Sequence, residues 1–212
     1  PNHSAENAIA QAERMIQSVG CHYGIDIDIK SFFDNVNHGK LLKQMWTLGI
    51  RDKKLLSIIS AMLKAEVAGI GFPEKGTPQG GIISPLLSNI VLNELDWWIS
   101  SQWETMPTYT QYKPHISKNG TISCANKFRV LQESKLKEMY IVRYADDFKI
   151  FCRDYVTATK VMYATKLWLE ENLHLQTSDE KSGITNLRKN YTTFLGIKFK
   201  VVPKGNKWII RS

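Results

Sequence analysis

Cysteine is scarce in this sequence, and no apolar run is long enough to cross a bilayer. The three cysteines, Cys21, Cys124 and Cys152, are widely spaced and form no CxxC pair, which argues against a disulfide framework or a zinc ribbon. A membrane span needs about 20 consecutive apolar residues, and the N-terminus lacks the basic-then-apolar pattern of a signal peptide. We therefore expect a protein of a reducing cytoplasm without a membrane partner. Because the chain starts at Pro1 rather than Met, we also expect it to be a piece of a longer protein.

Acidic residues are also few. The 212 residues contain 28 Lys and Arg against 20 Asp and Glu, a formal net charge of +8, and no acid follows Glu180. Hydrophobic residues make up 43% and charged residues 23%, the composition of an ordinary folded protein rather than of a disordered one. The excess of positive charge favours a polyanionic partner, with nucleic acid ahead of an acidic membrane surface.

The order of helical and strand patterns is that of an α+β protein. Apolar residues at helical spacing predict helices over about 5–19, 38–48, 52–66, 84–102 and 155–172. Alternation and β-rich runs predict strands over 24–29, 140–144, 148–152, 191–199 and 207–210. Residues 104–138 are polar and irregular, as in an insertion, and 177–183 is predicted to be a loop. This order predicts an antiparallel sheet packed on helices.

Carboxylates mark the polar positions of the predicted sheet. Asp26 and Asp28 share one face of the strand over 24–29, and Asp146 and Asp147 lie at the turn of a predicted hairpin. Side by side in one sheet these groups would converge, which is costly unless a cation joins them. Oxygen ligands without nearby His or Cys select Mg²⁺ or Mn²⁺, and a metal pair is the usual arrangement for phosphoryl transfer.

The spacing leaves two choices among these carboxylates open. Asp26 and Asp28 point to the same face, so strand periodicity does not distinguish which one is the ligand. Asp146 and Asp147 are adjacent and would point to opposite faces of a regular strand, unless the turn rotates one of them.

Tyr144-Ala145-Asp146-Asp147 resembles the YADD box of reverse transcriptases. Two further blocks take the form typical of bacterial group II intron-encoded maturases. Five blocks in all accompany the YADD box in the family's order: the second fingers motif (1–9), the first catalytic-aspartate motif (28–38), the nucleotide-pocket motif (76–89), the lysine-bearing motif (173–182) and the primer grip (194–197). The two in maturase form are those at 28–38 and 76–89.

The resemblance implies a right-hand polymerase palm with part of the fingers. Residues 1–25 would be a remnant of the fingers, and 26–212 the palm with interleaved fingers helices at about 38–80. An insertion at about 104–138 and a C-terminal primer-grip hairpin complete this single domain. Nothing in the sequence matches the thumb or the first fingers motifs, so we expect the thumb to be absent from this piece.

The resemblance also implies a metal site. Asp28 and Asp146 would ligate two Mg²⁺ ions, or Mn²⁺ in their place, with Asp147 beside them. The carbonyl oxygen of Ile29 would be a further ligand, and Asp26 would be a bystander.

Other residues would hold the substrates. Phe33 falls where the family keeps a bulky gate against the ribose 2′-hydroxyl, the feature that distinguishes ribonucleotides. Gln79 and Gly80 would line the incoming nucleotide, and Lys181 would protonate or neutralise the leaving pyrophosphate. The primer grip would consist of Phe194, Leu195 and Gly196.

The function implied is that of an RNA-directed DNA polymerase, a nucleotidyltransferase of a group II intron maturase in the bacterial cytoplasm. It would extend a primer 3′-hydroxyl on an RNA template with dNTPs and bind intron RNA, and a homodimer is compatible with this role. The alternative is an RNA-binding splicing cofactor without significant polymerase activity. The intact set of Asp28, Asp146 and Asp147 favours the polymerase, because an RNA scaffold gains nothing from clustered like charges.

Overall fold

The computed structural model describes residues 4–67, 71–77, 81–118, 122–205 and 207–211. The helices are α1 (Ala5–Arg14), α2 (Phe32–Asn35), α3 (His38–Thr47), α4 (Lys53–Leu63), α5 (Ser84–Gln102), α6 (Ala125–Glu133) and α7 (Tyr155–Trp168), with π-helical turns η1 (Met15–Val19) and η2 (Leu169–Leu173) extending α1 and α7. The strands are β1 (Tyr23–Ile29), β2 (His115–Ile116), β3 (Ile122–Ser123), β4 (Met139–Tyr144), β5 (Asp147–Cys152), β6 (Thr177–Asn186), β7 (Thr192–Phe194), β8 (Ile197–Lys204) and β9 (Lys207–Arg211). None of the described helices is long and apolar enough to cross a membrane.

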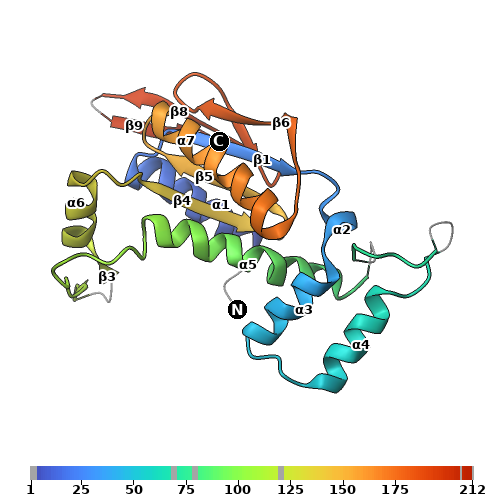
Figure 1. Ribbon diagram of the computed structural model, residues 1–212. Coiled ribbons are helices and arrows are strands. Elements are labelled where there is room, and N and C mark those ends of the chain that lie inside the picture. The colour runs from blue at the N-terminus through green and yellow to red at the C-terminus, as the bar shows by residue number, and fades with distance from the viewer. Residues whose placement is uncertain (1–3, 68–70, 78–80, 119–121, 206, 212) are drawn as a thin grey trace.

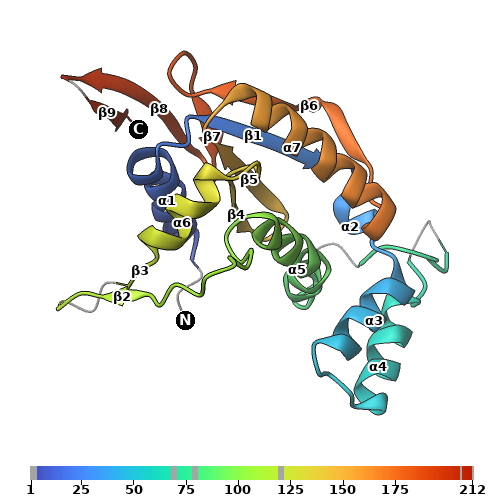
Figure 2. The ribbon, with the colours of Figure 1, turned by 60° about the vertical axis from the view of Figure 1, so that its left-hand side comes forward.

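A four-stranded antiparallel sheet in the order β4-β5-β1-β6 forms the centre of the molecule. Helices α5 and α7 cover one of its faces (Figures 1 and 2). The helix pair α3 and α4 projects from one end, and the small sheet β7-β8-β9 lies at the other (Figure 2). The α+β architecture predicted from the sequence is confirmed.

The alternating sequence of β1 explains which face of the sheet meets the helices. Ile25, Ile27 and Ile29 are buried, whereas Asp26 and Asp28 on the opposite face remain partly exposed. Successive side chains of a strand point to opposite faces, so burying the isoleucines against α7 leaves the carboxylates on the other side of the sheet.

Three segments differ from the prediction. The single strand predicted over 191–199 is wrong, because the chain turns at Leu195 and Gly196 and its two halves belong to β7 and β8, which pair with each other. The predicted loop over 177–183 is wrong, because these residues belong to β6, which pairs with β1. As an edge strand, β6 needs only backbone hydrogen bonds on one side, so it carries polar residues without apolar alternation. The irregular segment 104–138 contains α6 and the β2–β3 pair. Helix α6 escaped the periodicity argument because Leu131 is its one fully buried residue.

The segment before α5 folds back onto α2 and the residue that follows it. The Gly76 N–H donates to the Val36 carbonyl and the Thr77 N–H to the Phe33 carbonyl, both at 2.7 Å, and His38 Nε2 lies 2.6 Å from the Gly76 carbonyl oxygen. Gly76 has φ of 99°, and a Cβ there would lie 3.1 Å from the carbonyl oxygen of Phe33. Only glycine fits this close approach of two backbone segments.

We expect Gly76→Ala to be more destabilising than Gly49→Ala. Both glycines have φ near +98°, but a Cβ at Gly49 would meet nothing within 4 Å. Strain at positive φ costs about 1–2 kcal/mol in each variant, and the backbone contact should add about 1 kcal/mol at Gly76 alone. Urea unfolding of the two variants measures the difference, and equal losses of stability would show that the loop yields without cost.

Candidate active site

The pairing of β1 with β5 brings the carboxylates to one end of the sheet. Asp26 lies opposite Lys149 in this pairing, so Asp28, two residues further along β1, reaches the turn that carries Asp146 and Asp147. Asp28, Asp146 and Asp147 line one cavity of about 260 Å³, together with Asp26, Ile27, Ile29, Phe148 and Lys181. The structure thus places the three predicted aspartates around a common space.

Arg143 connects the turn between β4 and β5 to helix α5. Ala145 has φ of 56°, and its carbonyl oxygen accepts a hydrogen bond of 2.7 Å from Arg143 Nη1. The same guanidinium binds Asp96 of α5 at 2.5 Å and the Asn89 side chain at 2.8 Å. The left-handed residue turns the chain so that Asp146 and Asp147 line the same cavity. Sequence analysis missed Arg143, whose partner Asp96 is 47 residues away.

The carboxylates repel one another in the folded protein. The pKa of Asp147 is raised, first by partial desolvation and then by the negative charges of Asp146 and Asp28, while a hydrogen bond from the backbone N–H of Leu195 opposes the increase. Lys181 Nζ lies 4.0 Å from Asp28 Oδ2, but its side chain is 74% exposed. An exposed pair at that distance compensates little of the repulsion.

The donor chemistry of the cavity fits a hard divalent cation. Its side-chain ligands are carboxylates, with neither His nor Cys in its lining, and oxygen donors of this kind select Mg²⁺ or Mn²⁺. Within the described residues, no three His, Cys, Asp or Glu side chains form a ready-made metal centre. The three aspartates line the cavity but are not close enough together to form a ligand cluster, and a cation bound between them would relieve their repulsion.

Comparison with known proteins identifies the family. The family model described as reverse transcriptase (RNA-dependent DNA polymerase) matches residues 1–199. The chain belongs to this family. It is 29% identical over 242 residues to the group II intron-encoded protein LtrA of Lactococcus lactis, covering 97% of this chain and 39% of that protein. It is 30% identical to a 91 kDa protein in a cob intron of Schizosaccharomyces pombe, covering 84% of this chain and 25% of that protein.

Solved structures show the same fold. The structure of apo telomerase from Candida tropicalis matches 94% of this chain and 35% of its own chain with a TM-score of 0.57, at 13% identity. The palm and fingers architecture predicted from the sequence is therefore confirmed. The chain spans well under half the length of these two relatives.

The remaining predicted residues lie in different parts of the structure. Phe33 is half-buried and packs edge-to-face on Phe32 at 5.3 Å, and among the described residues it does not line the carboxylate cavity. Ile29 does line it. Gln79 and Gly80 lie outside the described residues.

The predicted primer grip reaches the carboxylates directly. Leu195 and Gly196 form the turn between β7 and β8 with φ of 49° and 80°, and the buried Phe194 anchors the start of that turn. Because the backbone N–H of Leu195 lies close enough to the carboxylate of Asp147 to lower its pKa, the tip of this hairpin lies beside the cavity.

A buried lysine ties the same hairpin to the central sheet. Lys149 is 1% exposed, forms an ion pair with Asp26 and donates to Thr192 Oγ1 at 2.7 Å. Thr192 Oγ1 in turn donates to Asp26 Oδ2 at 3.3 Å. Asp26, the carboxylate that periodicity could not separate from Asp28, therefore already has a cation. Sequence analysis missed Lys149, because a lysine in a strand gives no signal of burial.

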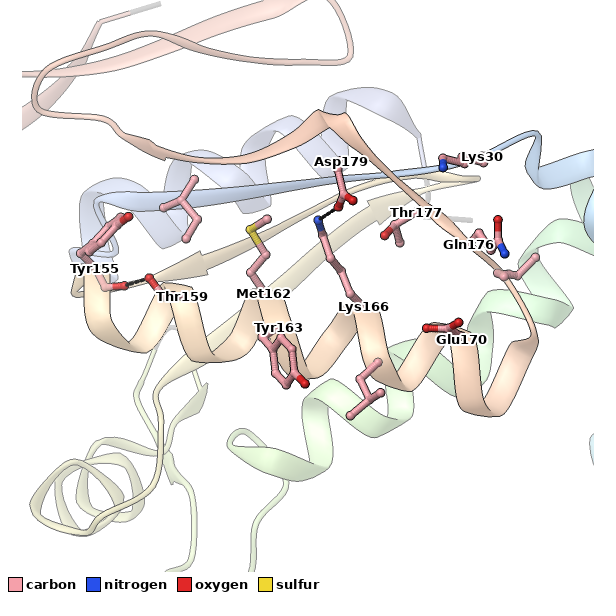
Figure 3. Close-up of a pocket in the computed structure, with 13 residues that line it drawn as sticks. Lys30, Tyr155, Thr159, Met162, Tyr163, Lys166, Glu170, Gln176, Thr177 and Asp179 are labelled. Atoms are coloured by element: carbon pink, nitrogen blue, oxygen red, sulfur yellow. Dashed lines mark hydrogen bonds and ion pairs between the residues drawn. The ribbon is translucent and has the colours of Figure 1, made fainter.

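A larger cavity of about 780 Å³ lies between α7 and β6 (Figure 3). Lys166 reaches across it to Asp179 at 2.7 Å, and the hydrogen bond and charge of Lys166 lower the pKa of that carboxyl. Asp179 is therefore already paired with a cation of the protein, so the greater size of this cavity does not make it the better candidate for catalysis.

Lys149→Met should loosen the primer-grip hairpin. Removing the cation leaves Asp26 and Thr192 without their shared partner, and we expect a loss of about 2 kcal/mol or more in the free energy of unfolding. Lys198→Met, an exposed lysine of β8, is the matched control and should change stability by less than about 0.5 kcal/mol. Urea unfolding compares them, and equal effects would contradict a structural role for the buried lysine.

Asp147→Asn is expected to stabilise the metal-free protein at neutral pH. Because the pKa of Asp147 is raised in the folded protein, its negative charge lowers the free energy of unfolding. This loss of stability is full at pH 7 and vanishes below the ordinary Asp pKa of about 3.9, where Asp147 is protonated in both the folded and the unfolded state. The gain measured by thermal unfolding in EDTA should therefore shrink as the pH falls from 7 toward 4.

A control with the opposite sign is Asp179→Asn, because the pKa of Asp179 is lowered in the folded protein. That variant should be slightly destabilised at pH 7. Mg²⁺ should stabilise the wild type more than Asp147→Asn. A pH-independent difference, or no response to Mg²⁺, would contradict the electrostatic description of the cavity.

Proposed function

We propose that this chain is the fingers and palm part of an RNA-directed DNA polymerase encoded by a group II intron. The observation that carries the proposal is the convergence of Asp28, Asp146 and Asp147 on one cavity, with the turn of the predicted primer grip beside Asp147. Such an arrangement suits attack of a primer 3′-hydroxyl on the α-phosphate of a dNTP.

The proposed division into palm and fingers follows the resemblance to the family. The palm comprises the central sheet with α5 and α7, and the projecting pair α3 and α4 belongs to the fingers together with residues 1–25. The segment 104–138 is an insertion between the nucleotide-pocket motif and the YADD box, and the thumb belongs to the longer protein.

The residues around the cavity would have different roles in nucleotidyl transfer. Asp28 and Asp146, with Asp147 and the Ile29 carbonyl beside them, would hold two Mg²⁺ ions, which supply charge stabilisation and lower the pKa of the attacking hydroxyl. Leu195 and its neighbours would position the primer end, since the backbone N–H of that turn lies beside Asp147. Lys181 is free to swing toward a pyrophosphate because its side chain is mostly exposed.

Substrate selection rests on the segment joined to the end of β1. Phe33 would exclude the ribose 2′-hydroxyl, and its backbone carbonyl already fixes Thr77 of the nucleotide-pocket motif. Gln79 and Gly80 would contact the incoming nucleotide. A single short segment thus couples the proposed sugar gate to the proposed nucleotide pocket.

The basic C-terminal region suits a nucleic-acid backbone. After Glu180 the chain carries no acid, and its cations are Lys181, Arg188, Lys189, Lys198, Lys200, Lys204, Lys207 and Arg211. Contacts of this type give affinity that falls with salt and carry no sequence choice. Template RNA with a DNA primer, and intron RNA, are the proposed partners.

Primer extension in the full-length protein tests the proposal. With a DNA primer on an RNA template, dNTPs and Mg²⁺, Asp146→Asn should reduce extension by about a hundredfold or more, because it removes a ligand charge while keeping the shape. Asp179→Asn, an exposed aspartate paired with Lys166, is the matched control and should extend normally. Phe33→Ala should allow rNTPs that the wild type rejects.

The outcomes separate the two candidate roles. Tight RNA binding without extension, unchanged by Asp146→Asn, would overturn the polymerase and leave an RNA-folding splicing cofactor. Loss of extension in Asp146→Asn with RNA binding retained would support the polymerase.

A further inference from the structure

A pocket rich in tryptophan lies on the helix-covered side of the central sheet. It has a volume of about 390 Å³ and is enclosed by α3, α5 and the C-terminal end of α7. We call it the tryptophan pocket, and its lining is Gln44, Thr47, Leu48, Ile90, Asn93, Glu94, Trp97, Trp98 and Trp168. The catalytic carboxylates project from the other face of the sheet, so this pocket is separate from the candidate active site.

The indoles offer flat apolar surface to solvent. Trp98 and Trp168 stack on each other with ring centroids 5.2 Å apart and an angle of 17° between their planes. Trp97 remains 65% exposed and Leu48 50% exposed. Aromatic faces presented beside a hollow suit stacking of a planar ligand.

One buried polar atom in this lining has no partner. Gln44 is 3% exposed, and its Nε2 donates to the Val91 carbonyl at 3.1 Å. Within the described part of the chain, its Oε1 is buried without any hydrogen bond. A buried acceptor in this state costs about 1–3 kcal/mol, and an N–H donor from a ligand would remove that cost.

The size and polarity of the tryptophan pocket restrict the class of ligand that it could bind. A cavity of about 150 Å³ holds a benzene ring, so the tryptophan pocket has ample room for a heterocycle. The ligand must be planar to lie on the indoles and must carry an N–H for Gln44 Oε1. An unstacked nucleobase with an amino group meets both requirements.

The surrounding charge favours a nucleic acid as the carrier of that base. Between residues 38 and 64 the chain has one acid, Asp52, and six cations: Lys40, Lys43, Arg51, Lys53, Lys54 and Lys64. The acid that lines the pocket, Glu94, is paired with Lys40 at 2.7 Å. Phosphates beside α3 and α4 would therefore meet cations and a neutralised carboxylate.

We propose that the tryptophan pocket captures an unpaired, amino-bearing base of a bound RNA, away from the polymerase cleft. The base stacks on the indoles, its amino group donates to Gln44 Oε1, and the flanking phosphates lie along α3 and α4. This inference rests on the proposed function, since it specifies how the protein would hold RNA that is not being copied.

Binding of three RNA hairpins by the full-length protein tests this pocket. The hairpins share one stem and carry loops of adenosine, of purine riboside, which lacks the amino group, or of abasic residues. The wild type should bind the adenosine loop most tightly and the abasic loop least. Trp97→Ala should weaken binding of the adenosine loop about tenfold, because stacking on an aromatic side chain is lost.

Variants at Gln44 and elsewhere isolate the hydrogen bond. Gln44→Met should make adenosine and purine riboside loops bind equally, while leaving both tighter than the abasic loop. Tyr163→Ala, an exposed aromatic on α7, is the matched control and should bind as the wild type does. Trp97→Phe keeps a stacking face and should restore most of the affinity.

The results also separate this proposal from the polymerase. Trp97→Ala should extend a short primer–template normally, whereas Asp146→Asn should lose extension and still prefer the adenosine loop. Equal affinity of the wild type for adenosine and abasic loops would overturn the pocket. Indoles already shielded from acrylamide quenching in the RNA-free full-length protein would also overturn it, because another segment of the chain would then fill the space.

Discussion

The pairing of Asp26 with Lys149 fixes the register of β1 against β5, and the position of the carboxylates depends on that register. A slip of one residue would turn the isoleucines of β1 away from the helices and the aspartates into them. In the observed register the buried Lys149 lies opposite Asp26, whereas a register shifted by one residue would separate the two charges. Through Thr192, the same lysine orients the hairpin that carries the proposed primer grip.

This arrangement leaves the molecule with an electrostatic conflict at the end of the sheet. Asp26 is neutralised by Lys149, but in the described part of the chain the only ion-pair partner of Asp28, Asp146 and Asp147 is the exposed Lys181. Arg143 holds the turn without neutralising them, because its charge is paired with Asp96. The repulsion among these carboxylates lowers the local stability of the protein, and a bound divalent cation would relieve it. Stability is therefore lower at the place where the proposed chemistry needs negative charge.

Much of the fold and part of the candidate site were predicted from the sequence. Strict alternation in β1 and the β-rich runs around Asp146 gave the strands, because one-sided burial imposes a period of two. The convergence of Asp28 with Asp146 and Asp147 was predicted as well. The edge strand β6 and helix α6 were not, because neither buries a regular apolar face. Arg143 and Lys149 were missed because their partners Asp96 and Asp26 lie 47 and 123 residues away in the sequence, and only the three-dimensional fold joins them.

The central claim is that the three aspartates form a cation site for nucleotidyl transfer. Titration of Mn²⁺ into the protein bound to primer–template and a non-reactive dNTP analogue, followed by electron paramagnetic resonance, tests it most directly. The account predicts two tightly bound ions in the wild type and loss of tight binding in an Asp28→Asn, Asp146→Asn double variant. Equal Mn²⁺ binding by the wild type and the double variant would contradict it.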